Sequence, residues 1–322
     1  LLALHCPNLR LLGVSTVHGN ASAECTEINA ARCLYAYGAP EDVHVYPGAT
    51  KPLIRPARHD PEIHGLDGLG GVEGLPSPTS EAVLMRLGAK DQAVRAVEGI
   101  ARAILTDRSR KITIISTGPL TNIALFVSVY PDLLDSVEEF VFMGGGVGIG
   151  NRSAVAAEAA QIVLDVPVRK VMIPLNVTHT AIVTRDWHCE LLAPGSAPSE
   201  ALPKPQTNLR HTLSTLINFF TEAYKSTFGF IDGPPLHDAL TIAYVCRPEL
   251  FSSKRYRVNV ELSGAHTSGE TVVDVWGYHS TDNSWGATGK NCLVTESLDV
   301  NGFFALFLDC VRRCDEVSPL NH

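Results

Sequence analysis

Apolar runs and amphipathic stretches alternate along most of this chain. Short runs of apolar, often β-branched residues without polar alternation, such as residues 112–115 and 140–143, predict strands that are buried on both faces. Residues 206–228 carry apolar side chains every three to four positions, which predicts an amphipathic helix. Strands that alternate with helices in this way are typical of an α/β fold with a mostly parallel sheet.

The same two patterns, continuous apolar runs for strands and apolar side chains every three to four positions for helices, predict the remaining elements. The predicted strands span residues 11–17, 43–46, 112–115, 140–143, 171–175, 256–262, 271–275 and 293–297. The predicted helices span residues 23–37, 80–106 with a break near 88–89, 120–128, 206–228, 237–245 and 300–313. Residues 55–78, rich in Gly and Pro, predict a long loop of the kind that is often functional. We expect one domain over residues 1–322, built on an open, Rossmann-like sheet flanked by helices, with additional strands and helices toward the C-terminus.

Composition narrows the class of protein. Hydrophobic residues make up 45% of the 322 residues and charged residues 19%, a balance that can supply a sizeable core. The net charge is −8 and no basic stripe is present, which argues against nucleic-acid or anionic-membrane partners. No apolar run is long enough to span a membrane, and a cytoplasmic location is the default expectation.

Eight cysteines are spread along the chain without a C-x-x-C pair, mostly in apolar stretches. We therefore expect buried, reduced thiols. Cys310 and Cys314 lie one helical turn apart, which leaves a metal or redox pair as the weaker alternative.

Two motifs carry the chemistry. Ile-Ser-Thr-Gly-Pro-Leu-Thr-Asn at residues 115–122 follows a predicted strand and opens a helix, and Gly-Pro-Pro-Leu-His-Asp-Ala-Leu at residues 233–240 places His237 beside Asp238 at a helix start. A His exchanges protons near neutral pH, and a carboxylate is a hard oxygen ligand. The pair can thus serve a leaving group and a divalent cation together, although an isolated Asp at a helix start is often only a cap.

Together the two motifs resemble those of the inosine-uridine nucleoside hydrolases, calcium enzymes that cut the N-glycosidic bond of ribonucleosides. The resemblance implies that Asp238 and the backbone carbonyl of Thr117 are Ca²⁺ ligands. It also implies that His237 helps to protonate the departing base, which carries negative charge as the bond breaks. The Thr-Gly-Pro sequence also makes the turn between strand and helix, and the two interpretations are compatible.

Three further segments resemble substrate-binding motifs of the same family. Asn20, at the end of Val-Ser-Thr-Val-His-Gly-Asn, would contact the ribose hydroxyls, and His64 would reach the substrate from a loop that folds over it. Met143 and Asn151 bracket a glycine-rich segment that would hold the sugar. This segment lacks the spacing of a dinucleotide-binding loop. Outside this context Asn20 is a turn residue, and His64 would simply be exposed.

The chain departs from the family pattern in two places. A short internal segment after Asn151 is missing, so Glu158 is either the ribose-binding Glu or a residue of the next helix. The acidic cluster of the form D-x-D-x-x-x-D-D, with its strand, is absent, and Leu1, Leu2 and Leu4 resemble the end of the helix that follows it. The cluster would supply the water-activating carboxylate and most side-chain ligands of Ca²⁺, which takes six to eight oxygens. We therefore expect a weakly active or inactive nucleoside hydrolase-like protein.

The resemblance also implies a small ribonucleoside as ligand and assembly into homo-oligomers. The main alternative is a non-catalytic paralogue that binds nucleoside or ribose, or that partners full-length subunits. A poorly folded splice product and a nicotinamide oxidoreductase are more distant alternatives. Tyr224 and Phe228 could stack on a base, but the sequence does not distinguish purine from pyrimidine.

Overall fold

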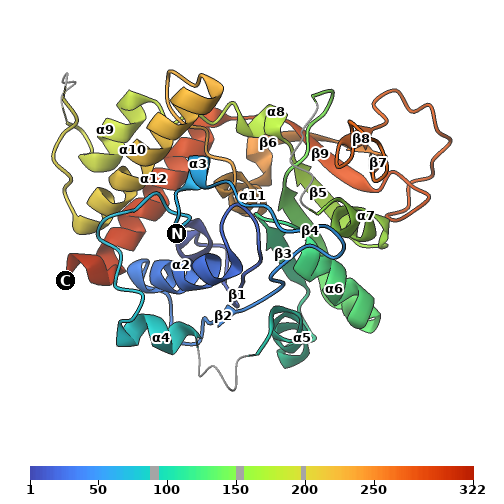
Figure 1. Ribbon diagram of the computed structural model, residues 1–322, viewed down its shortest axis with the longest axis horizontal. Helices are drawn as coiled ribbons and strands as arrows, with labels where there is room; N and C mark the ends of the chain where they lie inside the picture. Colours follow the sequence, from blue (N-terminus) through green and yellow to red (C-terminus); the bar gives the residue numbers. More distant parts are fainter. Residues whose placement is uncertain (88–93, 150–155, 197–200) are drawn as a thin grey trace.

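The computed structural model describes residues 1–87, 94–149, 156–196 and 201–322 (Figure 1). Within these residues the largest sheet has the strand order β3-β4-β5-β9-β6, in which β3, β4, β5 and β9 are parallel and β6 is antiparallel. Its strands are β3 (Ile112–Ser116), β4 (Val137–Met143), β5 (Arg169–Ile173), β9 (Cys292–Leu298) and β6 (Phe251–Tyr256). The predicted α/β class with a mostly parallel sheet is therefore confirmed.

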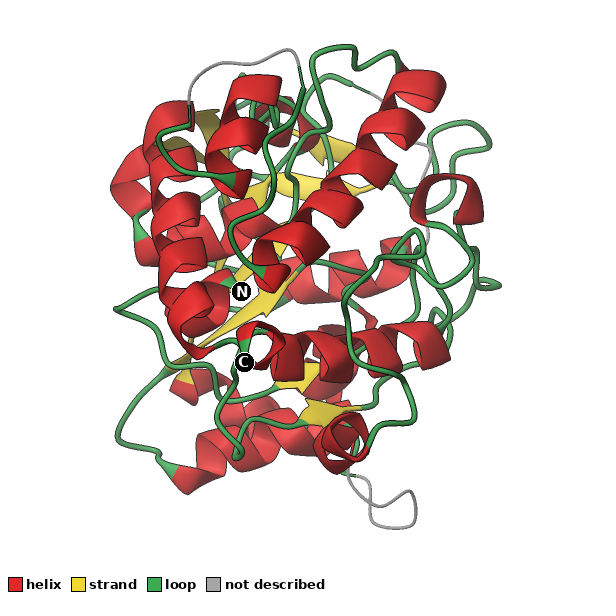
Figure 2. Ribbon diagram, turned by 90° about the vertical axis from the view of Figure 1, so that its left-hand side faces the viewer, coloured by secondary structure: helices red, strands yellow, loops and turns green. Residues whose placement is uncertain are grey.

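Two smaller sheets accompany it among the described residues. β1 (Val14–Ser15) pairs in parallel with β2 (Val45–Tyr46), and β7 (Val258–Val260) pairs antiparallel with β8 (Thr271–Val273). Figures 1 and 2 show β1 and β2 in a separate layer below the larger sheet. The chain therefore contains two separate parallel sheets where the sequence pattern predicts one.

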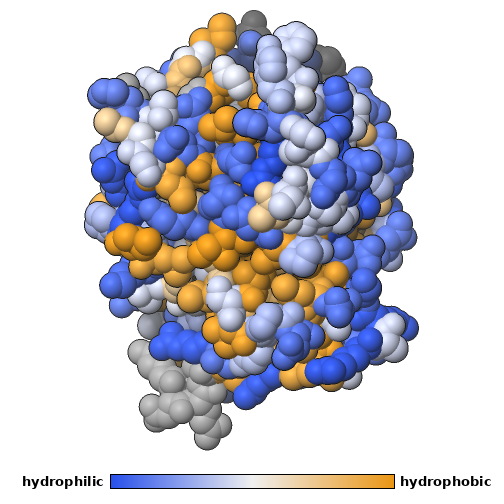
Figure 3. Space-filling view, turned by 90° about the vertical axis from the view of Figure 1, so that its right-hand side faces the viewer, coloured by the Kyte–Doolittle hydropathy of each residue, from blue (hydrophilic) through white to orange (hydrophobic). Residues whose placement is uncertain are grey.

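Helices cover both faces of the larger sheet. One face packs against α5 (Ala96–Thr106), α6 (Thr121–Val129) and α7 (Ala157–Asp165), whose apolar side chains share a core with β4. The other face packs against α1 (Leu2–His5), α11 (Ala239–Cys246) and α12 (Val300–Val317). The side of the molecule that includes α5 and α6 shows a band of apolar surface across its middle (Figure 3).

The remaining helices surround this arrangement. They are α2 (Ala23–Ala36), α3 (Pro61–His64), α4 (Glu81–Leu87), α8 (Leu175–Thr178), α9 (Arg185–Leu192) and α10 (Asn208–Phe228), with 3-10 turns η2 (Pro131–Ser136), η3 (Pro248–Leu250) and η4 (Pro319–Asn321). The hydroxyl of Thr207 caps α10 by accepting a hydrogen bond from the Arg210 amide, and Gly229 ends the helix with φ +76°. Glycine adopts that left-handed conformation at little cost.

Several sequence-based boundaries were wrong. The strand predicted over residues 11–17 is regular only at Val14–Ser15, and the one predicted over residues 256–262 is split between β6 and β7. The sequence analysis also missed α9, whose apolar face is short. Within the described residues no helix combines the length and apolar character needed to cross a membrane.

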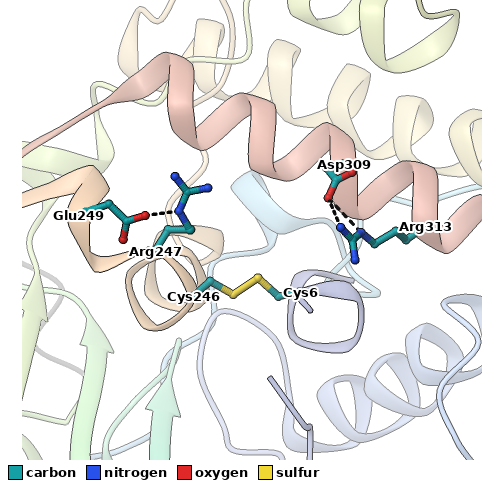
Figure 4. Close-up of a disulfide and its surroundings, with 6 residues drawn as sticks. All are labelled: Cys6, Cys246, Arg247, Glu249, Asp309 and Arg313. Carbon is teal, nitrogen blue, oxygen red and sulfur yellow. Dashed lines mark hydrogen bonds and ion pairs between the residues drawn. A yellow bond between two sulfur atoms is a disulfide. The ribbon is translucent and has the colours of Figure 1, made fainter. Parts of the chain in front are cut away.

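The expectation of reduced cysteines was wrong for two of them. Cys6 at the end of α1 and Cys246 at the end of α11 form a disulfide with a Cα–Cα distance of 6.6 Å (Figure 4). Their separation of 240 residues hides the pairing in the sequence, whereas the packing of α1 on α11 brings them together. Cys310 and Cys314 are free, buried thiols, as expected.

Candidate active site

A cavity of about 2540 Å³ opens between the smaller parallel sheet and the larger one. The carboxyl ends of β1, β3 and β4 reach its wall, as expected for a ligand site in an open α/β sheet. The predicted site residues that line it are Asn20, His64, Thr117, Met143, His237 and Asp238. The structure thus brings five separate segments of the chain to one cavity.

The side chain of His237 is held at both ring nitrogens. Nδ1 lies 2.7 Å from the Thr178 hydroxyl, and Nε2 lies 3.0 Å from the Tyr224 hydroxyl. Thr178 Oγ1 also donates to the Leu175 carbonyl at 3.4 Å, so its lone pair is free to accept from Nδ1–H. This network assigns the tautomer protonated at Nδ1, in which Nε2 accepts the Tyr224 hydroxyl proton.

Burial keeps both partners of the Nε2 bond uncharged at neutral pH. It lowers the pKa of His237 to about 4, with smaller contributions from His179 and His64. Burial likewise raises the pKa of Tyr224 to about 12, helped by Asp238. The wall therefore presents a neutral, hydrogen-bonded Tyr–His pair to the cavity.

Aromatic rings surround this pair. His179 lies 5.5 Å from His237 and 5.2 Å from Phe230 between ring centroids, and Tyr224 lies 5.3 Å from Phe228. The His64 ring lies 5.5 Å from Phe220 on the same helix as Tyr224. These aromatic rings suit a flat heterocycle, which can stack on a ring face or edge while it hydrogen-bonds to the Tyr–His pair.

Asp238 stands at the start of α11 but does not cap it, because its carboxylate accepts no hydrogen bond from the first turn. Its side chain is exposed to the cavity, yet protein surrounds the cavity, and this desolvation raises the pKa of Asp238 to about 7. Thr117, which begins the β3–α6 turn, is likewise open to the cavity. No Lys, Arg or His of the described ranges forms an ion pair with the Asp238 carboxylate.

The described residues do not make a calcium site. No group of three or more His, Cys, Asp or Glu side chains in the described ranges is arranged to hold a metal ion. Asp238 and the Thr117 carbonyl fall well short of the six to eight oxygens that Ca²⁺ takes. The residues present therefore do not fit the metal that the sequence resemblance implies.

One predicted sugar contact, Glu158, is not among the residues that line the cavity. Glu158 lies in the first turn of α7, where Oε1 accepts a hydrogen bond of 2.7 Å from Arg55 Nε. Asn151 falls outside the described residues. Of the two alternatives for Glu158, its position favours a residue of the helix, paired with the long loop that follows β2.

Other functional candidates were missed by the sequence analysis. Thr178 and His179 follow β5, and their position at the carboxyl end of a buried strand was the available signal. Asn122 is buried and ties the two sheets together: its side-chain amide donates to the Thr16 carbonyl at 2.8 Å and accepts from the Ala49 amide at 2.9 Å. No local pattern marks such a long-range contact.

The fold is that of the nucleoside hydrolases. Solved structures with the same fold include a purine-preferring ribonucleoside hydrolase from Gardnerella vaginalis, with TM-score 0.81, 24% identity, and coverage of 98% of this chain and 94% of that one. An inosine-guanosine nucleoside hydrolase matches with TM-score 0.80, 23% identity, and coverage of 97% and 93%.

Sequence comparison is more specific than the fold. The family model described as inosine-uridine preferring nucleoside hydrolase matches residues 1–305. The chain is 35% identical over 319 residues to the pyrimidine-specific ribonucleoside hydrolase RihA of Escherichia coli, covering 97% of this chain and 93% of that protein. It is 34% identical to a probable ribonucleoside hydrolase of Dictyostelium discoideum, covering 98% and 90%. The chain belongs to the inosine-uridine preferring nucleoside hydrolase family, whose members are nucleoside N-ribohydrolases.

Proposed function

We propose that this chain is a ribonucleoside hydrolase-like protein for uridine- or inosine-type nucleosides, and that residues 1–322 alone are weakly active or inactive. The observation that carries the proposal is the Tyr224–His237–Thr178 network on the wall of the cavity. Its place beside Asp238, in a cavity shared with Asn20 and Met143, supports a nucleoside-sized ligand.

The network is suited to protonating the nucleobase as it departs. As the N-glycosidic bond breaks, the base takes the bonding electrons and becomes anionic unless it gains a proton. The proton shared by Tyr224 Oη and His237 Nε2 lies at this wall and is proposed as the one that the base receives. Thr178 fixes the ring of His237, so that the donor does not rotate away. Asn20 and Met143 are proposed to contact the ribose.

Activation of the attacking water is not provided for by the residues that the structure describes. Attack on the anomeric carbon needs a carboxylate that removes a proton from water, and general-base catalysis typically contributes 10²–10⁴-fold. Asp238 would have to serve both as base and as metal ligand, and the described residues hold no group of three or more His, Cys, Asp or Glu side chains that could hold a metal ion. We therefore propose that residues 1–322 bind Ca²⁺ weakly.

The test is ribose release from uridine, inosine and cytidine, with calcium and with a chelator. It compares residues 1–322 with the same chain preceded by an acidic N-terminal segment of the family pattern. We expect turnover mainly from the extended protein, and loss of that turnover with His237→Ala. Robust calcium-dependent release by residues 1–322 would contradict the proposed weak activity.

A non-catalytic nucleoside-binding protein is the second candidate, favoured by the absence of a metal-ligand cluster among the described residues. Calorimetric binding of uridine or inosine without ribose release, in both forms of the chain, would support it. From the family resemblance we also propose a single domain, homo-oligomers and a cytoplasmic location. Limited proteolysis, light scattering and imaging of a tagged chain test these three points.

A further inference from the structure

His64 reaches the cavity without a hydrogen bond from its own ring. The half-buried imidazole lines the cavity, and within the described residues neither of its nitrogens is hydrogen-bonded. The ring packs edge-on against Phe220 of α10, with 5.5 Å between the two centroids. The direction in which the imidazole points is therefore set mainly by the backbone that carries it.

That backbone folds into a tight turn directly after His64. α3 ends with His64, and the Gly70 amide donates back to the His64 carbonyl at 2.9 Å. Asp67 lies inside the turn, where its carboxylate accepts hydrogen bonds from the amides of Leu69 at 3.0 Å and Gly71 at 3.1 Å. The Asp67 side chain thus pairs backbone donors that so tight a turn leaves without a carbonyl partner.

Helix α2 holds the turn from one side. Asn29 Nδ2 donates to the Asp67 carbonyl at 2.7 Å, and Asn29 Oδ1 accepts from Arg32 Nη1 at 3.3 Å. Arg32 Nε in turn donates to the Pro76 carbonyl at 2.8 Å, farther along the same loop. Asn29, Arg32 and Asp67 are half-buried, and water weakens such bonds less there than at an exposed surface. The Asn29 side chain is therefore fixed at both its oxygen and its nitrogen.

Helix α10 supports the turn from the other side, so that the loop lies between α2 and α10 (Figure 1). Gly70, with φ +63°, lies against the Phe219 ring so closely that a Cβ there would clash with it. Farther from His64, the Glu73 amide donates to Thr215 Oγ1 at 3.2 Å. Ring packing against a glycine has little directional preference, whereas a hydrogen bond has a preferred geometry. The orientation of the turn therefore depends on its bonds from the α2 side.

We propose that Asp67 and Asn29 are positioning residues for His64. Asp67 shapes the turn that carries the imidazole, and Asn29 fixes that turn to α2, so that the ring stays directed into the cavity. The inference rests on the proposed function in one respect, namely that His64 meets the bound nucleoside. The position of the ring can be measured without any nucleoside, so the two claims fail separately.

The first measurement is the pH titration of the His64 ring by NMR, with the signal assigned by its disappearance in His64→Gln. Burial lowers the pKa of His64 from its ordinary value of 6.5, while Asp60 acts in the opposite direction. We expect Asn29→Ala and Asp67→Ala to release the ring into water and to raise its titration midpoint towards 6.5. Amide exchange at residues 69–71 should quicken in the same two variants.

Asp67→Asn and Leu66→Ala are the matched controls, and thermal melts check that every variant folds. Asp67→Asn keeps a side-chain oxygen that can accept from the Leu69 and Gly71 amides. Leu66 belongs to the same turn, but its side chain is 93% exposed. Both controls should keep the titration midpoint and the slow amide exchange of the unaltered chain. A loss in Asp67→Asn equal to that in Asp67→Ala would contradict the role given to the turn, because charge alone would then matter.

The second measurement is the affinity for uridine and inosine by calorimetry. We expect affinity to fall about fivefold in Asn29→Ala and Asp67→Ala, the loss typical of one hydrogen bond to a ligand. Asp67→Asn and Leu66→Ala should bind as the unaltered chain does. This comparison tests whether the position of His64 matters to the ligand.

The outcomes separate the two claims. An unchanged titration and unchanged exchange in both alanine variants would overturn the proposal, because the contacts with α10 would then suffice to place His64. A ring that moves while nucleoside affinity stays the same would overturn the part of the proposal that links His64 to the ligand. A ring that moves in a chain that binds no nucleoside at about 1 mM would support the positioning and count against the proposed function.

Discussion

β3 and β4 are neighbouring strands of one sheet and both carry apolar runs, yet they are packed very differently. Phe140, at the centre of β4, is 0% exposed, and most of that strand is buried. Every residue of β3 is only half-buried, although four of its five residues are β-branched Ile or Thr and three of those are Ile. The difference is that β4 has a strand on each side, whereas β3 has one only on the β4 side.

This comparison shows what an apolar run can and cannot predict. The run at residues 112–115 correctly predicts a strand suited to burial between two neighbours. It carries no information about whether the second neighbour is present. The half-buried edge is a property of the assembled sheet.

The largest expected effect comes from truncating a large apolar side chain in each of the two strands. Phe140→Ala removes a fully buried ring from the core and should destabilise the fold by about 3–5 kcal/mol. Ile114→Ala removes a half-buried side chain and should cost about 1–2 kcal/mol, since part of its surface already meets water. Urea denaturation measures both. Equal costs would show that β3 is as well packed as β4, and the comparison would fail.

The contact between α9 and α10, which lies away from the edge at β3, should make folding stability depend strongly on pH. His188 of α9 is buried, with Nε2 2.8 Å from the Ser214 hydroxyl of α10, and burial lowers its pKa to about 4. The unfolded chain, with a pKa near 6.5, binds the proton first as the pH falls. Stability present above pH 6.5 should therefore be lost between pH 6.5 and about 4, by about 3 kcal/mol for this residue.

His188→Gln provides the control for this pH effect, because its amide can still hydrogen-bond to Ser214 but does not titrate. Denaturation curves at several pH values should show a steeper loss for the unaltered chain than for the variant. Parallel curves would mean that His188 is not held neutral by the fold.

A smaller effect is expected from the contact behind His237. Thr178→Val keeps the shape of a fully buried side chain but leaves Nδ1–H of His237 without its acceptor, at a cost of about 1–3 kcal/mol. Nitrogen NMR of the histidine ring should show a mixture of tautomers in place of one. Thr178→Ser should restore the single tautomer; a spectrum unchanged in the valine variant would mean that Thr178 does not orient the ring.

Sequence reasoning succeeded where a local signal was strong. The apolar runs predicted the α/β class and the mostly parallel sheet, which the structure confirms. Thr117, His237 and Asp238 line one cavity, and their roles in catalysis and metal binding stay predictions. It failed where the structure depends on distant partners. Thr178 meets His237 across 59 residues, Cys6 meets Cys246 across 240, and neither pair has a periodic signature. Likewise the split between the two parallel sheets follows from what lies beside each strand, which no window of sequence contains.

The smallest expected effect concerns an ion pair that links the loop after β2 to α7, and so the smaller parallel sheet to the larger one. Arg55, on the loop after β2, pairs with Glu158 of α7 and donates to the Leu262 carbonyl at 2.9 Å. Both side chains are mostly covered, and Glu158 Oε2 has no other partner within the described residues. Arg55→Gln should thus cost about 1 kcal/mol, whereas Arg312→Gln, which breaks exposed pairs on α12, should cost less than about 0.5 kcal/mol. Amide exchange should quicken in β1 and β2 only for Arg55→Gln, because that pair alone of these two holds the smaller sheet to the larger half. Unchanged amide exchange of β1 and β2 in both variants would mean that other contacts suffice to hold the two sheets together. These contacts are the hydrogen bonds of Asn122 to Thr16 and of His18 to Thr121.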